Sequence, residues 1–330
     1  MSVIDTPYSA VEGSALAKAR AAITRVPVIY AVLVVLLILI YWRTPAFFQM
    51  NSLVAFIRSA APLIVVAIGQ MFVLVSGEID LSVGSLITVA AALAAKIIDS
   101  DSANIGTALL VVIVVAAGVA LINAVVTTVF HVPSFATTLA MLLIAQGAIS
   151  IVTNGAPQGG LTPEFRALGR NNFAETGIPN ALLVTIAVVL GSLILLNFTT
   201  FGRRVYAVGG NAAAARLSGI SVGRIKGACF LICSLCGALG SILLVGFSGM
   251  SSLNVGNGFE FQSISAAVLG GVALTGGRGS VFGATAGALA LQLVFRLLNL
   301  LSLPLPFRLT VQGLIILGAV AVGSVRRSRS

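Results

Sequence analysis

Few residues in this chain could carry out chemistry, and two acids that could do so, Glu78 and Asp80, lie close together. They lie two positions apart in "VLVSGEIDLSVGSLITVAAALAA" (residues 73–95), between two apolar runs. Such a pair could act as a general acid and base, or belong to a proton relay. No nucleophile or histidine lies near the pair in sequence, and a relay needs further ionisable groups. We therefore favour a structural role.

The structural role that we expect is helix capping at the turn between the two apolar runs. Asp80 or Ser82 can accept a hydrogen bond from the first free amides of a helix that begins near Val83. A carboxylate at this position also meets the positive end of the helix dipole. We expect the two acids to lie at the end of a membrane span, outside its middle.

The cysteines and the histidine do not form a metal site in the sequence. Cys229, Cys233 and Cys236 fall along one face of a single apolar helix, "GACFLICSLCGAL", with no histidine or carboxylate to complete a ligand set. We expect them to be small packing residues. His131 is the one histidine of the chain and precedes Val132-Pro133, so we expect it in a loop.

The segment "TGGRGSVFG" (residues 275–283) has the glycines of a phosphate-binding loop but lacks its other features. A Walker A loop needs a lysine after the glycines and a preceding strand, and neither is present. We expect Gly276, Gly277 and Arg278 to form a turn between helices, with Ser280 starting the second one. The longer stretch "VALTGGRGSVFGATAGALA" (residues 272–290) resembles residues 73–95, so we expect the same helix–turn–helix device to be used twice, as in the internal repeats of transporters.

The composition predicts an integral membrane protein built from helices. Of 330 residues, 58% are hydrophobic and 8% are charged, against about 25% charged in soluble domains. Mean hydropathy is +1.10. The apolar runs are long enough for helices, and the roughly ten-residue alternating segments of a membrane barrel are absent from the sequence. The net charge of +10 does not indicate nucleic-acid binding, because the basic residues lie at the ends of apolar runs.

These runs predict an all-α polytopic protein with about ten transmembrane helices in one membrane domain, residues 24–324. The first helix is expected to be an uncleaved anchor, because no small-residue cleavage site follows it. Residues 1–23 and 325–330 are expected to be tails. The predicted spans are 26–42, 52–76, 82–98, 107–129, 134–152, 180–198, 227–248, 259–275, 281–301 and 307–324.

The distribution of lysine and arginine predicts that both tails of this multi-pass protein are cytoplasmic. Cytoplasmic segments carry an excess of these residues. With the N-terminus inside, the inner segments hold Lys18, Arg20, Arg25, Arg203, Arg204, Arg216, Arg224, Lys226, Arg278, Arg326, Arg327 and Arg329. The outer segments hold Arg43, Lys96, Arg166, Arg170 and Arg308.

The longest inner loop, residues 199–226, contains a candidate docking helix. In "NAAAARLSG", Asn211 can cap the start of a short helix and Gly219 can end it. The alanines leave a face small enough to fit a groove on another protein. The alternative is a surface linker that keeps positive charge inside. The candidate docking residues are Gly210, Asn211, Ala213, Ala214, Ala215, Arg216, Leu217, Ser218 and Gly219.

Five segments resemble the permease subunits of ribose-type ATP-binding cassette importers, which also include arabinose, xylose, galactoside and autoinducer-2 permeases. They span most of the chain after residue 60, in the order found in the family. The segments are "SGEIDLSVGS" (76–85), "VPSFATTLAMLLIAQG" (132–147), "FGRRVYAVGGNAAAARLSGI" (201–220), "FQSISAAVLGGVALTGGRGSVFG" (261–283) and "GLIILGAV" (313–320).

The resemblance implies the partners of an importer. These are a second permease copy or close relative, two ATPase domains on the cytoplasmic face that bind the ATP and Mg²⁺, and a periplasmic solute-binding protein. It also implies that residues 211–219 form the coupling helix. Three positions depart from the family: Glu78 replaces a common Gly, and Val272-Ala273 replaces a frequent Thr-Ser.

We therefore expect a permease subunit for a monosaccharide, polyol or related small polar solute, with no metal or cofactor bound by this chain. Polar residues within spans are candidates for the pore, namely Gln70, Asn123, Gln262 and Gln292. The alternative, a self-sufficient secondary transporter or channel, would need charges along its pore, and only Arg58 and Arg296 lie within spans. A membrane enzyme would need clustered His, Asp or Cys.

Overall fold

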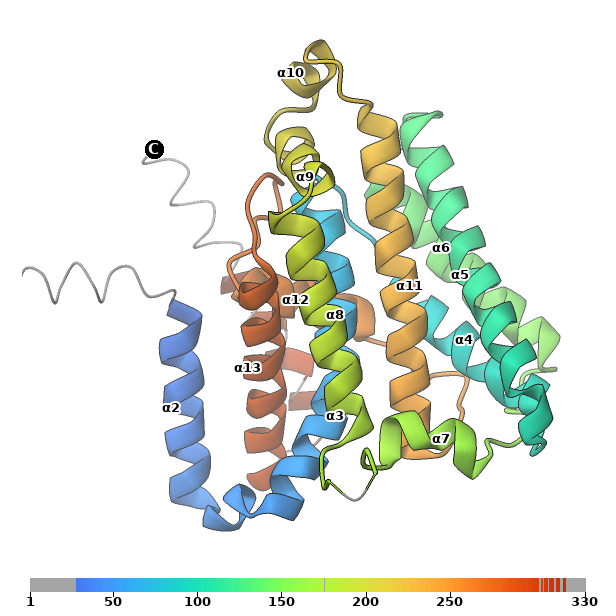
Figure 1. Cartoon of the computed structure of the whole chain (residues 1–330), viewed down its shortest axis with the longest axis vertical. Coiled ribbons are helices and arrows are strands. Elements are labelled where there is room, and N and C mark those ends of the chain that lie inside the picture. Colours follow the sequence, from blue (N-terminus) through green and yellow to red (C-terminus); the bar gives the residue numbers. More distant parts are fainter. Residues whose placement is uncertain are drawn as a thin grey trace, which may run out of the picture.

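The computed structural model describes residues 28–174, 176–302, 304, 306–307, 309–311, 313–314 and 317–318. Every regular element within these residues is a helix (Figure 1). The elements are α2 (Val28–Arg43), η1 (Pro45–Phe48), α3 (Met50–Val75), α4 (Val83–Ile98), η2 (Ser102–Asn104), α5 (Ile105–Thr128), α6 (Ser134–Val152), α7 (Pro163–Arg170), α8 (Asn180–Asn197), α9 (Thr200–Gly210), α10 (Ala212–Leu217), α11 (Val222–Ser248), α12 (Phe259–Leu269) and α13 (Val281–Leu300).

The prediction of a polytopic helical membrane protein is confirmed, but the count of ten spans is not. Among the described residues, six helices are long and apolar enough to cross a membrane. These are α3, α5, α6, α8, α11 and α13. Two further apolar helices, α2 and α4, have 16 residues each. The predicted span 307–324 and the tails 1–23 and 325–330 lie largely or wholly outside the described residues.

The predicted span 259–275 is wrong, because its helix stops early. α12 has 11 residues, or about 16 Å of helix, against roughly 30 Å of hydrocarbon. Gly271 adopts a φ of +87° and ends the helix. Its amide donates to Val268 O at 2.9 Å and the Val272 amide donates to Ala267 O at 3.0 Å, which is a Schellman ending. The chain then continues as turns until Ser280.

The centre of the bundle consists of the second half of α3 and almost all of α4. Every residue of α3 from Ala60 to Val75 is buried. α11 packs along both helices, while α12 and α13 pack on α3. The approach of α11 depends on small residues, since a Cβ at Gly69 would lie 2.7 Å from the Cβ of Cys236. The cysteines thus serve as packing residues, as the sequence predicts, and all three are free.

The outer segment 153–179 contains a helix that the hydropathy did not predict. α7 is short and amphipathic, with Thr162 capping its start and Phe165 buried. It packs against the last turns of α11, where a Cβ at Gly169 would overlap the backbone of residues 243–247. Ser102 Oγ donates to Glu164 Oε2 at 2.6 Å, and this bond lowers the pKa of the exposed Glu164 carboxyl.

Residues 76–82 form a non-helical segment inside the bundle, and the hydroxyls of α6 bind its amides. α3 ends in a Schellman motif at Gly77, with a φ of +87°. Beyond it, Ile79 N–H donates to Ser134 Oγ at 3.1 Å and Leu81 N–H donates to Thr138 Oγ1 at 3.0 Å. Backbone groups at membrane depth must find partners within the protein. One face of α6 therefore holds this segment in place.

This arrangement predicts different effects for the same substitution at two adjacent positions. Thr138→Val leaves the buried Leu81 amide without its acceptor and should lower the free energy of unfolding by about 1 to 3 kcal/mol. Thr137→Val is the matched control, because the buried Thr137 hydroxyl has no partner among the described residues. Thermal unfolding of the purified protein in detergent measures both. Equal melting temperatures for the two variants would contradict the assignment.

Candidate functional site

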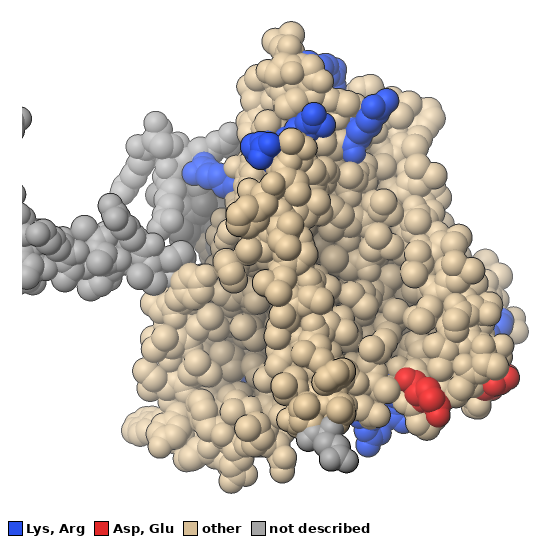
Figure 2. Space-filling view, viewed as in Figure 1, with Lys and Arg blue, Asp and Glu red and all other residues tan. Residues whose placement is uncertain are grey.

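One end of the bundle carries half of the basic side chains in the described part of the chain. We call it the basic end. It is formed by α9, α10 and the start of α11. Figure 2 shows a group of Lys and Arg at this end, whereas the visible acidic side chains lie at the opposite end together with further Lys and Arg. The basic residues of these elements and of the turn after α12 are Arg203, Arg204, Arg216, Arg224, Lys226 and Arg278.

α10 is the predicted docking helix, and both of its predicted ends are confirmed. Asn211 Oδ1 accepts a hydrogen bond from the Ala214 amide at 3.0 Å. Gly219, at a φ of +77°, donates to Arg216 O, and the Ile220 amide donates to Ala215 O, each at 3.0 Å. These bonds satisfy the ends of a helix that has only six residues.

The two faces of α10 differ in exposure. Ala215 is 5% exposed and packs into the main core, so it does not belong to an outward docking face. Ala213 and Ala214 are exposed, as are Gly210, Ser218 and Arg216. Leu217 is 92% exposed, the largest value among the exposed large apolar residues of the described chain. The outward face of α10 thus combines small residues with one large uncovered apolar side chain.

Three backbone segments cross directly beneath α10. We call this crossing the glycine junction; it comprises Gly77, Gly209, Gly210, Gly276 and Gly277. Gly277 N–H donates to Val75 O at 2.9 Å. A Cβ at Gly276 would lie 2.9 Å from Gly77 Cα, and one at Gly277 would lie 2.8 Å from Gly210 Cα. Since such distances exclude any side chain, the end of α9 is in backbone contact with both turns.

Tyr206 adds a further link between α9 and the turn after α12. Its hydroxyl donates to Gly279 O at 2.8 Å. Partial burial raises the pKa of Tyr206 above its usual value, so the hydroxyl keeps its proton and its role as a donor. Gly276, Gly277 and Arg278 thus lie in a turn between helices, as predicted, and Ser280 Oγ caps α13 by accepting from Gly283 N–H at 3.0 Å.

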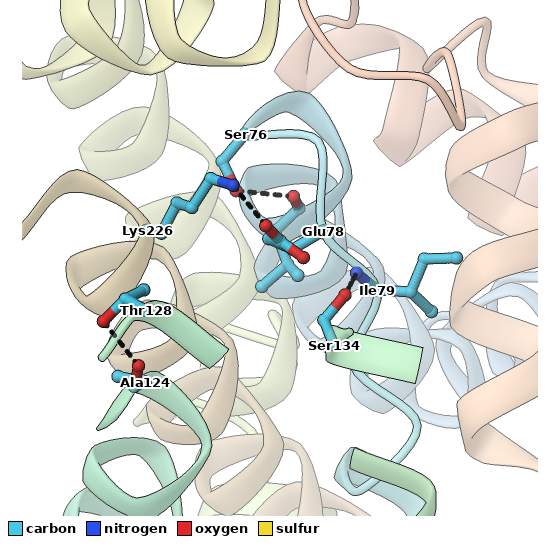
Figure 3. A network of polar contacts seen from close by, with 8 residues as sticks. Ser76, Glu78, Ile79, Ala124, Thr128, Ser134 and Lys226 are labelled. Atoms are coloured by element: carbon cyan, nitrogen blue, oxygen red, sulfur yellow. Dashed lines mark hydrogen bonds and ion pairs between the residues drawn. The ribbon is translucent and has the colours of Figure 1, made fainter. Parts of the chain in front are cut away.

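Glu78 forms an ion pair with Lys226, which links the turn after α3 to the start of α11 (Figure 3). Glu78 is 9% exposed, so breaking the pair would leave a nearly buried charge. The partners are separated by 148 positions, and sequence reasoning did not connect them. The signal for such a pair is that the sequence places Glu78 and Lys226 at the same predicted membrane surface, in a chain with only 8% charged residues.

Asp80 lies in the protein interior, which corrects the expectation of a carboxylate at the end of a span. It is 1% exposed. Its Oδ1 accepts from Ser82 N at 2.8 Å and from Ser82 Oγ at 2.6 Å. Asn123 Nδ2 donates to the same Ser82 Oγ at 2.9 Å. Ser82 is the N-cap residue of α4 but makes no side-chain cap with it, and its backbone angles are already helical, at φ −74° and ψ −12°.

The candidate pore residues are not brought together. Gln70 and Asn123 are fully buried, and Gln70 Oε1 accepts from Cys233 Sγ at 3.4 Å, so both belong to interhelical contacts. Gln262 and Gln292 are half-buried on α12 and α13, outside these contacts. The two cations within spans also make structural contacts. Arg58 donates to Asn172 Oδ1 at 2.5 Å, and Arg296 lies 5.9 Å from the ring centroid of Phe47.

Comparison with known proteins identifies the family. Residues 52–320 match the family described as the permease component of the branched-chain amino acid transport system. The chain belongs to this permease family. It is 33% identical to the ribose import permease protein RbsC of Escherichia coli strain K12 over 297 residues, which cover 89% of this chain and 92% of the relative. It is therefore a transport subunit and not an enzyme.

Two further relatives extend this comparison. The permease is 33% identical to the ribose import permease protein RbsC of Bacillus subtilis strain 168, over 87% of this chain and 89% of the relative. It is 37% identical to the L-arabinose transport system permease protein AraH of Escherichia coli strain K12, over 77% of each chain. No solved structure matches the permease.

The glycine junction predicts opposite outcomes at two adjacent glycines of α9. A Cβ at Gly209 would overlap the Val75 carbonyl, whereas one at Gly210 meets nothing within 4 Å. Gly209→Ala should therefore cost about 1 to 3 kcal/mol of unfolding free energy through overpacking. Gly210→Ala should be neutral or slightly stabilising, because alanine favours a helix. Thermal unfolding in detergent compares them, and a stable Gly209→Ala variant would refute the close crossing.

Proposed function

We propose that this permease is the membrane-spanning subunit of an ATP-driven, binding-protein-dependent importer for a monosaccharide or a related small polar solute. The names of its relatives support the solute class, since they are ribose and L-arabinose permeases that match the chain over most of its length. The chain sits in the bacterial inner membrane with the basic end and both tails in the cytoplasm. The concentration of arginine and lysine at that end supports this orientation.

We infer that α10 docks on a separate ATPase chain, which binds the ATP and Mg²⁺. The single observation that carries this inference is the outward face of α10. An apolar side chain that is 92% exposed at the tip of a cytoplasmic helix favours burial in a partner's groove. Ala213 and Ala214 beside it are exposed and small, so they allow close approach. Ala215 instead anchors α10 on the permease.

The contacts beneath α10 supply a route for coupling. Because the end of α9 touches both turns through the glycine junction, a displacement of α10 must move the turn after α12 and the turn after α3. The turn after α3 leads into residues 76–82, which are held by α6 and by the pair of Glu78 with Lys226. A movement of the ATPase would thereby be transmitted to α3, α4 and α12.

The remaining partners follow from the importer assignment. A second copy of the permease, or a close relative, completes the translocation pathway within the lipid bilayer. A solute-binding protein docks at the end opposite α10, where α7 and its neighbouring loops lie. Recognition of the solute resides largely in that binding protein.

Substitutions on the outward face of α10 test this function. Leu217→Asp and Ala214→Trp should each reduce retention of the ATPase by tenfold or more. This reduction corresponds to a loss of about 2 kcal/mol of binding free energy, as expected when an interface loses an anchor residue. They should also reduce ATP hydrolysis stimulated by binding protein loaded with ribose or arabinose. The readouts are co-purification in mild detergent and hydrolysis by the reconstituted complex.

Leu168→Asp is the matched control for this experiment. Leu168 is also an exposed leucine, but it lies on α7 at the opposite end. This variant should retain the ATPase at the wild-type level. Unchanged retention and hydrolysis in both Leu217→Asp and Ala214→Trp would exclude α10 as the docking helix.

A further inference from the structure

A small pocket lined by several polar side chains opens at the basic end, separate from the outward face of α10. It has a volume of about 70 Å³ and lies where the end of α5, the end of α10 and the start of α11 meet. Its lining includes Thr127, Thr128, His131, Arg216, Gly223 and Lys226. The pocket is far smaller than the several hundred Å³ of a typical small-molecule site, so it suits a single compact group.

The lining of this pocket is rich in hydrogen-bond donors and in positive charge. Arg216 and Lys226 bring two cations, and the Glu78 carboxylate neutralises one of them through its ion pair with Lys226. His131 adds a ring N–H. The first amides of α11 point outward from the helix start, and Ser221 makes no side-chain cap with them among the described residues. The dipole of the 27-residue α11 adds positive potential at the same place.

A buried hydroxyl in this pocket points independently to a ligand. Thr127 is 8% exposed and lines the pocket, yet its Oγ1 has no hydrogen-bond partner in the described chain. A buried hydroxyl without a partner is costly, so a ligand that accepts its hydrogen bond would stabilise the site.

We propose that this pocket binds a phosphate group, supplied either by the head group of an anionic lipid in the inner leaflet or by free phosphate. A helix start beside arginine and lysine is a favourable environment for a tetrahedral oxyanion. Its contacts would join Arg216 of α10 to α5 and α11, so the bound phosphate would restrain α10 against the bundle. The choice of an inner-leaflet lipid rests on the proposed orientation of the basic end, whereas the pocket itself does not depend on whether α10 docks on an ATPase.

Native mass spectrometry of the full-length permease in detergent tests this site. The probes are dioleoyl-phosphatidylglycerol, dioleoyl-phosphatidylcholine and inorganic phosphate. The wild type should bind phosphatidylglycerol or inorganic phosphate more tightly than it binds phosphatidylcholine. Arg216→Gln should weaken that binding about tenfold, which corresponds to the loss of one charge-assisted hydrogen bond. Thr127→Val, which removes only a hydroxyl, should weaken it severalfold.

Each variant has a matched control outside the pocket. Arg204→Gln removes an exposed arginine of α9, and Thr137→Val removes another buried hydroxyl without a partner. Both should bind like the wild type. Competition by inorganic phosphate would identify free phosphate as the ligand, whereas lipid binding without competition would identify the head group. The proposal fails if neither probe binds, or if the pocket variants bind the probes as tightly as their controls do. An acidic side chain of a partner chain would then be the remaining candidate for the pocket.

Discussion

The architecture depends on one physical requirement, which is that a stretch of non-helical backbone inside a membrane protein must find hydrogen-bond partners. Residues 76–82 leave the end of α3 and enter α4 within the bundle, where water cannot satisfy their amides. Ser134 and Thr138 of α6 accept from two of these amides, and Asp80 accepts from a third. The position of α6 is thereby tied to the turn between the two central helices.

The same requirement explains why three helices near the basic end finish in the same way. α3, α10 and α12 end in Schellman motifs at Gly77, Gly219 and Gly271, each with a positive φ. This ending satisfies the last carbonyls and turns the chain sharply. The turns after α3 and α12 are then compact enough to meet the end of α9 in backbone contact. The glycine junction therefore depends on the way in which these helices end.

Features that depend on neighbouring residues could be predicted from the sequence. The caps at Asn211 and Ser280 and the positive φ of Gly219 are set within a few residues, and the structure has all three. The apolar runs predicted most helices with ends near those observed. The end of α12 was missed because residues 272–274 are as apolar as the helix before them, so hydropathy runs on past Gly271.

Features that depend on distant residues could not be predicted in this way. The ion pair of Glu78 with Lys226 and the hydroxyls that serve residues 76–82 come from other helices, 55 to 148 positions away. The sequence predicted Asp80 at the membrane surface. Its burial could not be predicted from neighbouring residues, because it is created by helices that pack around it. Gln70 and Asn123 were assigned to a pore on polarity alone, whereas their contacts join helices.

The central claim is that α10 and the two turns beneath it move as one unit, and hydrogen–deuterium exchange tests it most directly. The measurement compares the complete transporter with and without bound ATP, in peptides that cover residues 73–83, 205–220 and 268–280. The glycine junction predicts that amide protection changes in all three segments together. A change confined to residues 211–220, with the other two segments unaltered, would contradict the account.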